Sequence, residues 1–302
     1  MASTSTVKRL SAVEKYPNWL EIPHELMANI LKRLGDVEIL NSAVKVCTTW
    51  RRIGRDPAMW KFINIKFAPN ADYDIEALTK QAVHLSSGEL SDISLEVFGS
   101  DDLLHHVVSR SSKLNSLCLT NCNNITGSGL NHALKRAPQL EKLYITYTTS
   151  MMKPYEVLVP NCPNLKSFKL DKAYIYVGIA NDDDALAIAN TMPELRHLQL
   201  YGNAMSEIGL KAILDGCPHL ESLDIRTCYN VDIHGDELKL SMERLKSFKG
   251  PNDSTENCGF HRRIFENVDS DGLPDSFFHE YDITQYTSVP SYIDYFIDYY
   301  SL

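Results

Sequence analysis

Cysteine and histidine are the residues of this 302-residue chain whose spacing would most readily indicate chemistry. The seven cysteines are scattered and include no CxxC pair, so neither a zinc clip nor a thioredoxin-like redox motif is indicated. The ten histidines are dispersed without ligand spacing, and His105-His106 fits a solvated helix face. The chain has no GxSxG, HExxH, P-loop or dinucleotide-binding glycine pattern. We therefore predict no catalytic residue, no metal site and no cofactor.

Paired acids are the other pattern that could do chemistry. Asp101-Asp102 and the run of three aspartates at 182–184 each precede a helical pattern. Carboxylates at the start of a helix favour its N-terminus, which carries partial positive charge. We therefore interpret them as helix caps, in preference to a glycosidase-like acid pair.

Charge is distributed very unevenly along the chain. Of the net charge of −9, residues 251–302 carry −8, from ten acids and two bases, and residues 1–250 carry −1. Neither part has the basic excess that phosphate binding requires, and no stretch approaches ~20 consecutive apolar residues. We expect no nucleic-acid partner and no membrane partner. The scattered cysteines and the absence of a secretory signal indicate a reduced compartment, cytoplasmic and/or nuclear.

An LxxLxL pattern recurs through the middle of the chain and indicates the repeated strands that position the side chains of this region. Its copies begin at residues 60, 90, 114, 140, 165, 195, 220 and 245, at intervals of 24 to 30 residues. These intervals are near those of leucine-rich repeats, with two longer units that need loop insertions. Four of the copies are preceded by a proline, which cannot extend a helix and so indicates the turn into a strand. These prolines are Pro138, Pro163, Pro193 and Pro218.

Segments with helical spacing separate these strands, for example 74–85, 101–109 and 206–215. Alternating strand and helix predict an α/β fold: a horseshoe-shaped solenoid of about eight units, partial ends included, over residues 60–250, with parallel strands on its concave face. Cys122 and Cys228 fall at the Asn/Cys position of the repeat, where a small buried side chain fits. Metal binding by these two together with Cys162 and Cys217 is the weaker alternative.

Residues 19–60 form a different kind of unit, after a flexible N-terminus over residues 1–18. Pro23 begins a helix with an apolar stripe, which Gly35 ends. Asp36 can cap a second helix, which either continues to Trp50 or breaks before it, and Asp56-Pro57 begins another turn. About 40 residues in three short helices are marginal as an independent fold, so we expect apolar surface that a partner covers.

The order of residues in this segment resembles an F-box: Leu20-x-Ile22-Pro23-x-Glu25-Leu26, then Val46-Cys47-x-x-Trp50-Arg51, then Asp56-x-x-x-Trp60. With the repeats behind it, the chain resembles the F-box/LRR-repeat proteins, especially their shorter plant-type members. The resemblance implies a non-catalytic substrate receptor of an SCF-type ubiquitin ligase. The F-box would bind a Skp-family adaptor, and through it a cullin and a RING protein, while the repeats would hold an unknown protein substrate.

Two sets of binding residues follow. The candidate adaptor-binding residues are Leu20, Ile22, Pro23, Leu26, Ile30, Leu31, Leu34, Val46 and Trp50. Several of them could instead form the core that the helices share. In each repeat strand the leucines point inward and the alternate residues face outward. The candidate substrate-binding residues, where large and charged side chains gather, are Lys142, Tyr144, Lys169, Asp171, His197, Gln199, Tyr201, Asp224 and Arg226. A solvated face is the alternative.

Residues 251–302 form an acidic, tyrosine-rich C-terminal tail that begins where the repeats end. Residues 290–302 have helical spacing and could dock as a short helix, with a mobile tail as the alternative. For the whole protein two other functions remain open. One is an interaction scaffold outside a cullin ligase, and the other is a receptor that requires a small molecule.

Overall fold

The computed structural model describes residues 22–67, 72–146, 162–172, 174–177, 180–255 and 263–266. The chain divides into two compact units between Arg55 and Asp56. The sequence predicts that the F-box extends to residue 60, but the turn η3 (Pro57–Trp60) lies in the second unit. Asp56 caps this turn as expected, accepting a hydrogen bond from the backbone N–H of Ala58 at 2.9 Å. Trp60 is fully buried at the first position of the first repeat.

The N-terminal unit is helical. Its elements are α1 (His24–Lys32), α2 (Asp36–Glu38), the π-helical turn η2 (Ile39–Ala43), α3 (Val44–Val46) and α4 (Thr48–Ile53). The second helix breaks before Trp50: Cys47 is extended, with φ −154°, and its sulfur accepts a hydrogen bond from the N–H of Trp50 at 3.4 Å. α1 ends at Lys32 with Arg33 as its C-cap, before Gly35. Gly35, at φ +85°, is the N-cap of α2, so the prediction that Asp36 caps this helix is wrong. The core of the unit contains Met27, Leu31, Ile39, Leu40, Ala43 and Ile53.

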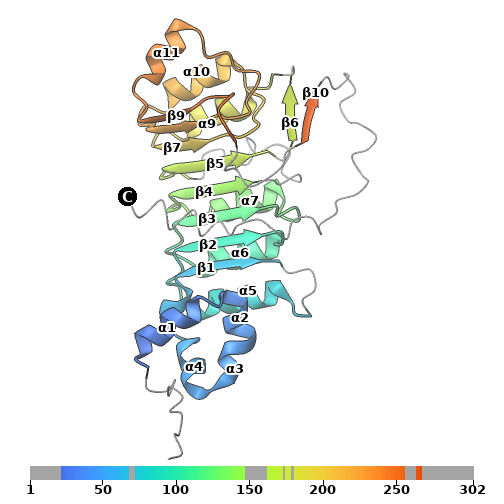
Figure 1. Ribbon diagram of the computed structural model, residues 1–302, viewed down its shortest axis with the longest axis vertical. Coiled ribbons are helices and arrows are strands. Elements are labelled where there is room, and N and C mark those ends of the chain that lie inside the picture. The colour runs from blue at the N-terminus through green and yellow to red at the C-terminus, as the bar shows by residue number, and fades with distance from the viewer. Residues whose placement is uncertain are drawn as a thin grey trace, which may run out of the picture. The chain divides into compact units, whose positions relative to one another are not determined.

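The second unit is built on one parallel sheet of eight strands, which confirms the predicted repeat architecture. The strands follow chain order: β1 (Phe62–Lys66), β2 (Asp92–Glu96), β3 (Ser116–Thr120), β4 (Lys142–Thr146), β5 (Ser167–Asp171), β7 (His197–Gln199), β8 (Ser222–Asp224) and β9 (Ser247–Lys249). Figure 1 shows them stacked as a ladder. Their repeat leucines are buried, from Leu90 to Ile225, whereas Leu245 and Phe248 of the last unit are half-buried.

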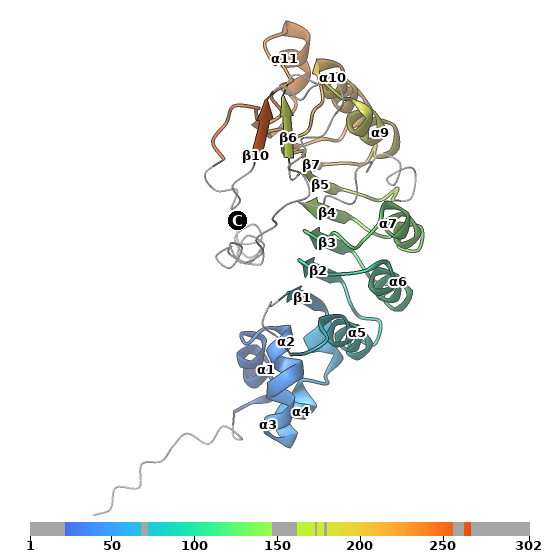
Figure 2. The ribbon, with the colours of Figure 1, turned by 90° about the vertical axis from the view of Figure 1, so that its right-hand side faces the viewer.

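The helices that the structure describes in the second unit lie together on one side of the sheet, as Figure 2 shows. They are α5 (Ile75–Leu85), α6 (Asp101–Arg110), α7 (Gly127–Leu134), α9 (Asp183–Thr191), α10 (Glu207–Gly216) and α11 (Asp236–Met242). The three helical segments predicted at 74–85, 101–109 and 206–215 correspond to α5, α6 and α10. The opposite face of the sheet is the concave face of the solenoid.

A residue with left-handed backbone follows the strand in several repeats. Val97, Asn121 and Thr227 have positive φ, between 53° and 68°, and each donates its backbone N–H to a carbonyl of the following repeat. In two of these turns the next residue is a cysteine, and its thiol donates a hydrogen bond to a carbonyl of the preceding repeat. The thiol of Cys122 donates to the carbonyl of Leu95 at 3.4 Å, and that of Cys228 donates to the carbonyl of Leu200 at 2.8 Å. Both cysteines therefore connect neighbouring repeats.

Burial makes the thiols of two cysteines, Cys122 and Cys217, poorly reactive, because only the thiolate is a nucleophile. Burial raises the pKa of Cys122 to about 12, and it raises the pKa of Cys217 to about 11. Within the described ranges, no group of three or more His, Cys, Asp or Glu side chains could hold a metal ion. The same part of the chain contains no helix that is both long enough and apolar enough to cross a membrane.

Carboxylates at the start of one helix bind the start of the next. Asp101, the first residue of α6, accepts hydrogen bonds from the N–H of Thr126 at 2.8 Å and from its hydroxyl at 2.7 Å. Thr126 is the N-cap of α7. Asp182 makes the same pair of bonds to Ser206, the N-cap of α10, at 2.7 and 2.8 Å. The sequence assigns both aspartates to their own helix, but they also order the N-terminus of the neighbouring helix.

Replacing Asp101 by alanine is therefore expected to lower the free energy of unfolding by about 2 kcal/mol, because two charge-assisted hydrogen bonds between repeats are lost. Asp102→Ala is the matched control. Asp102 lies in the same first turn of α6 and is paired with Lys80 at the surface. We expect a much smaller loss for it. Urea unfolding of both variants measures the difference, and equal losses would assign the effect to the helix dipole alone.

Residues 251–255 and 263–266, the described residues beyond Gly250, include contacts with earlier parts of the chain. The carbonyl of Pro251 accepts a hydrogen bond from the N–H of Thr227 at 2.9 Å, so the chain continues along the repeats past residue 250. Further on, β10 (Arg263–Glu266) pairs in parallel with β6 (Tyr174–Val177), the strand that follows β5, and the two form a second, two-stranded sheet. The N-terminal segment 1–18 and the helix predicted over 290–302 lie outside the described residues.

Candidate protein-interaction surfaces

The first helix of the N-terminal unit is apolar on two faces. Met27 and Leu31, four residues apart, are buried on the inner face. Leu26 and Ile30, also four residues apart, are 56% and 38% exposed on the outer face. Leu34 follows with 46% exposure, and Val46 at the end of α3 is 63% exposed. Four large apolar side chains exposed to solvent on so small a unit indicate a surface that a partner covers.

The predicted adaptor residues divide between this surface and the core. Pro23 is exposed and Ile22 and Trp50 are half-buried, whereas Leu20 lies outside the described residues. The sequence also predicts an adaptor contact at Leu31. That side chain is fully buried in the core of the unit, so it has no surface to offer.

The substrate residues predicted in the repeats come together on the concave face. Registered pairing places Tyr144, Lys169 and Gln199 side by side, and Asp224 pairs next to Gln199. Lys142 and His197 lie at the first positions of their strands, on either side of Ser167. The sequence pattern therefore selects one continuous surface across β4, β5, β7 and β8.

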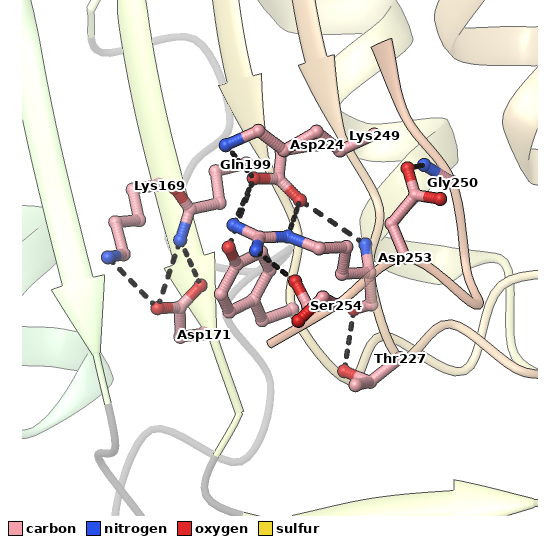
Figure 3. A network of polar contacts seen from close by, with 11 residues as sticks. Lys169, Asp171, Gln199, Asp224, Thr227, Lys249, Gly250, Asp253 and Ser254 are labelled. Atoms are coloured by element: carbon pink, nitrogen blue, oxygen red, sulfur yellow. Dashed lines mark hydrogen bonds and ion pairs between the residues drawn. The ribbon is translucent and has the colours of Figure 1, made fainter. Parts of the chain in front are cut away.

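A buried network occupies one end of this surface, as Figure 3 shows. The guanidinium of Arg226 donates to Asp224 through Nε at 3.0 Å and through Nη2 at 2.8 Å. The hydroxyl of Tyr201 donates to the same carboxylate at 3.0 Å, and the guanidinium stacks 4.7 Å from the centre of its ring. Arg226 Nη1 also donates to the carbonyl of Ser254 at 2.6 Å, so the network reaches the segment after the last repeat strand.

The charge state of Asp224 follows from competing effects. Burial raises its pKa to about 6, while the backbone N–H of Arg226 and the ammonium of Lys249 act in the opposite direction. The carboxylate is therefore mainly ionised at pH 7 and can balance the guanidinium. Beside it, the carboxylate of Asp171 is 3.1 Å from Lys169 Nζ and accepts hydrogen bonds from the amide of Gln199 at 3.2 and 3.3 Å.

Four of the predicted substrate residues are therefore structural. Asp171, Tyr201, Asp224 and Arg226 are between 2% and 8% exposed, and their polar atoms are bound to one another or to adjacent repeats. They have little surface left for a partner. The accessible members are His197, which is exposed, and four half-buried residues, which are Lys142, Tyr144, Lys169 and Gln199.

Sequence reasoning missed the charged residues that immediately precede the strands. Glu221 accepts hydrogen bonds from Arg196 and from Lys246, both at 2.7 Å. These contacts lower the pKa of Glu221. Lys166 donates to Glu141 at 2.6 Å in the same way. The signal was present in the sequence, because each of these residues directly precedes the first outward position of its strand.

The architecture defines the class: a leucine-rich-repeat protein with a helical N-terminal unit. Residues 19–66 match the family model described as "F-box-like", and residues 169–256 match that described as "FBD-associated F-box protein At5g56370, LRR repeats". The chain is 45% identical over 257 residues to "F-box protein SKIP19" of Arabidopsis thaliana, covering 84% of each chain. It is 42% identical to "Putative F-box/LRR-repeat protein 23" of the same plant, covering 83% of this chain and 57% of that protein. The chain therefore belongs to the F-box/LRR-repeat protein family.

Among solved structures, the chain is similar to "Crystal structure of Rad7 and Elc1 complex in yeast", with 13% identity and a TM-score of 0.35. The match covers 74% of this chain and 81% of that one. A likeness of this size carries no argument about function. The family assignment depends on the F-box match and on the relatives from Arabidopsis thaliana.

Proposed function

We propose that this protein is the substrate-recognition subunit of an SCF-type ubiquitin ligase. The F-box unit binds a Skp-family adaptor, and through it a cullin and a RING protein, while the concave face of the repeats holds a protein substrate. The protein works in the cytoplasm and/or the nucleus. Family membership supports this function, since F-box/LRR proteins are generally non-catalytic adaptor subunits.

One observation of the structure carries the proposal. Leu26 and Ile30 form an outward apolar face on α1, and Leu34 and Val46 extend the exposed apolar area of the same small unit. A unit of this size has too little mass to cover such a face, and an adaptor that binds there removes it from water. The repeats provide the second requirement, a separate polar surface that can hold another protein.

The mechanism that follows is proximity. A substrate held on the repeats has its lysines at high effective concentration near a ubiquitin-charged enzyme that the partners supply. The receptor determines which protein is modified, and its partners provide the bond-forming chemistry.

Co-purification tests the proposal against its nearest rival. The full chain, expressed with an affinity tag in plant cells treated with a proteasome inhibitor, is expected to recover both a Skp-family adaptor and a cullin. Recovery of the adaptor without any cullin would instead favour an interaction scaffold outside the ligase. Recovery of neither protein would contradict the F-box function itself.

A further inference from the structure

The concave face, together with the residues that directly precede its strands, carries a local excess of positive charge in a chain whose net charge is −9. In β4, β5, β7, β8 and β9 the charged side chains lie at the residue before each strand and at the first, third or fifth residue from its start. These positions hold seven cationic side chains and four carboxylates, an excess of three positive charges. The same positions in β1, β2 and β3 hold two cations and two carboxylates, so that part of the face is neutral.

The excess of positive charge persists because two of the carboxylates are each shared between two cations. Glu221 is bound by Arg196 and Lys246 together, and Asp224 is bound by Arg226 at 2.8 Å and lies 3.7 Å from Lys249. One carboxylate cannot neutralise two cations. The region around these two acids therefore remains positive although each of its carboxylates is paired.

The accessible row of this region consists of hydrogen-bond donors. The first positions of the five strands lie side by side in register, and we call them the donor row: Lys142, Ser167, His197, Ser222 and Ser247. All five are exposed or half-buried, in contrast to the buried fifth positions such as Asp171 and Arg226. The row contains no carboxylate. At ~4.8 Å between strands it spans ~19 Å, about the length of six residues of extended peptide.

We propose that the donor row binds an extended, acidic segment of the substrate protein. This inference rests on the proposed function and names the chemistry of the substrate. Aspartate and glutamate side chains accept charge-assisted hydrogen bonds from Lys142 and from the hydroxyls, and the excess charge steers an acidic segment toward the row. The chain's own negative charge disfavours nucleic acid as the occupant, because that partner needs a larger basic surface.

His197 at the centre of the row provides an independent readout. Burial lowers its pKa; Glu221 acts to raise it, and the cations Arg196, Lys246 and Lys142 lower it. A bound carboxylate raises the pKa, so binding takes up a proton. Affinity for an acidic peptide is then expected to increase as the pH falls from about 8 to 6. His197→Gln should weaken this dependence, and Asp224 on the adjacent strand, whose pKa is about 6, accounts for the part that remains.

The test uses the full chain and fluorescence anisotropy. The probe is a fluorescein-labelled peptide of alternating Glu and Ala, about ten residues long. Matched Gln–Ala and Lys–Ala peptides and a single-stranded DNA oligonucleotide are the comparison ligands. We expect binding of the acidic peptide that weakens with salt, and an affinity about tenfold lower for Lys142→Gln/Lys246→Gln. Lys113→Gln/Lys211→Gln removes two cations that are neither in the donor row nor next to it in the sequence, and this variant should bind as the wild type does.

The outcomes separate this inference from the proposed function. Equal affinity in both double variants, or preference for the Lys–Ala peptide or DNA, overturns the acidic-segment inference. Adaptor binding is measured on the same preparations. If adaptor binding persists while the acidic peptide fails to bind, only the inference is wrong. If the peptide binds but the adaptor does not, the donor row is supported and the ligase function is contradicted.

Discussion

Replacing Asp224 by alanine is expected to lower the free energy of unfolding by about 3 kcal/mol. The change leaves the guanidinium of Arg226 buried without the carboxylate that accepts its two hydrogen bonds at 3.0 and 2.8 Å. It also removes the acceptor of the Tyr201 hydroxyl. Uncompensated burial of a charge is among the largest effects that a single substitution can have. Urea unfolding followed by circular dichroism measures the loss.

Glu221→Ala is the matched control for this variant. Glu221 lies in the same repeat and also binds two cations, Arg196 and Lys246, but these cations are about half or more exposed to water. Water can replace the lost contacts there, so we expect only a small change in stability. The double variant Asp224→Ala/Arg226→Ala should lose less than the two single changes added together, since it buries no unpaired charge. Additive losses would contradict a coupled network.

The solenoid was predictable because its signal is local and repeated. Leu143 and Leu198 occupy the same position of their units, other units have a leucine, isoleucine or phenylalanine there, and both leucines are buried. The turns between units were not predictable in this way. The left-handed residues Val97, Asn121 and Thr227 share a backbone conformation but no type of side chain, so no residue pattern marks them.

The candidate site on the concave face could also be predicted only in part from the sequence. Alternation correctly places Tyr201 and Arg226 on this face, but their burial depends on contacts with Asp224 and with the carbonyl of Ser254, 28 residues after Arg226. Whether an outward-facing residue binds a partner or a neighbouring repeat is decided by the adjacent unit. A single strand's sequence does not contain that information.

On the first helix, the apolar stripe predicted from the sequence includes residues with opposite environments. Leu26 is 56% exposed and Leu31 is fully buried, although both are leucines of one helix. Helical periodicity identifies apolar positions but does not divide them between two apolar faces. The structure makes this division, and it therefore identifies which residues can be changed without harm to the core.

The double substitution Leu26→Ser/Val46→Ser is accordingly expected to lower affinity for a Skp-family adaptor by at least about 100-fold, with little change in stability. Both side chains are more than half exposed, so the isolated protein loses little packing when they are shortened. In the complex each would lose its apolar contact and leave a hydroxyl facing an apolar surface. Titration calorimetry with the purified adaptor measures affinity, and thermal unfolding checks stability.

Ile208→Ser/Leu240→Ser is the matched control, because both residues are 69% exposed but lie on the helices of the repeats. Loss of an exposed apolar side chain is then the same in the two variants, and only its location differs. If adaptor binding depends on the F-box face, the control binds as the wild type does. A Leu26→Ser/Val46→Ser variant that stays folded and still binds with wild-type affinity would show that the adaptor does not bind at these residues. The exposed apolar face of α1 would then bind a different partner.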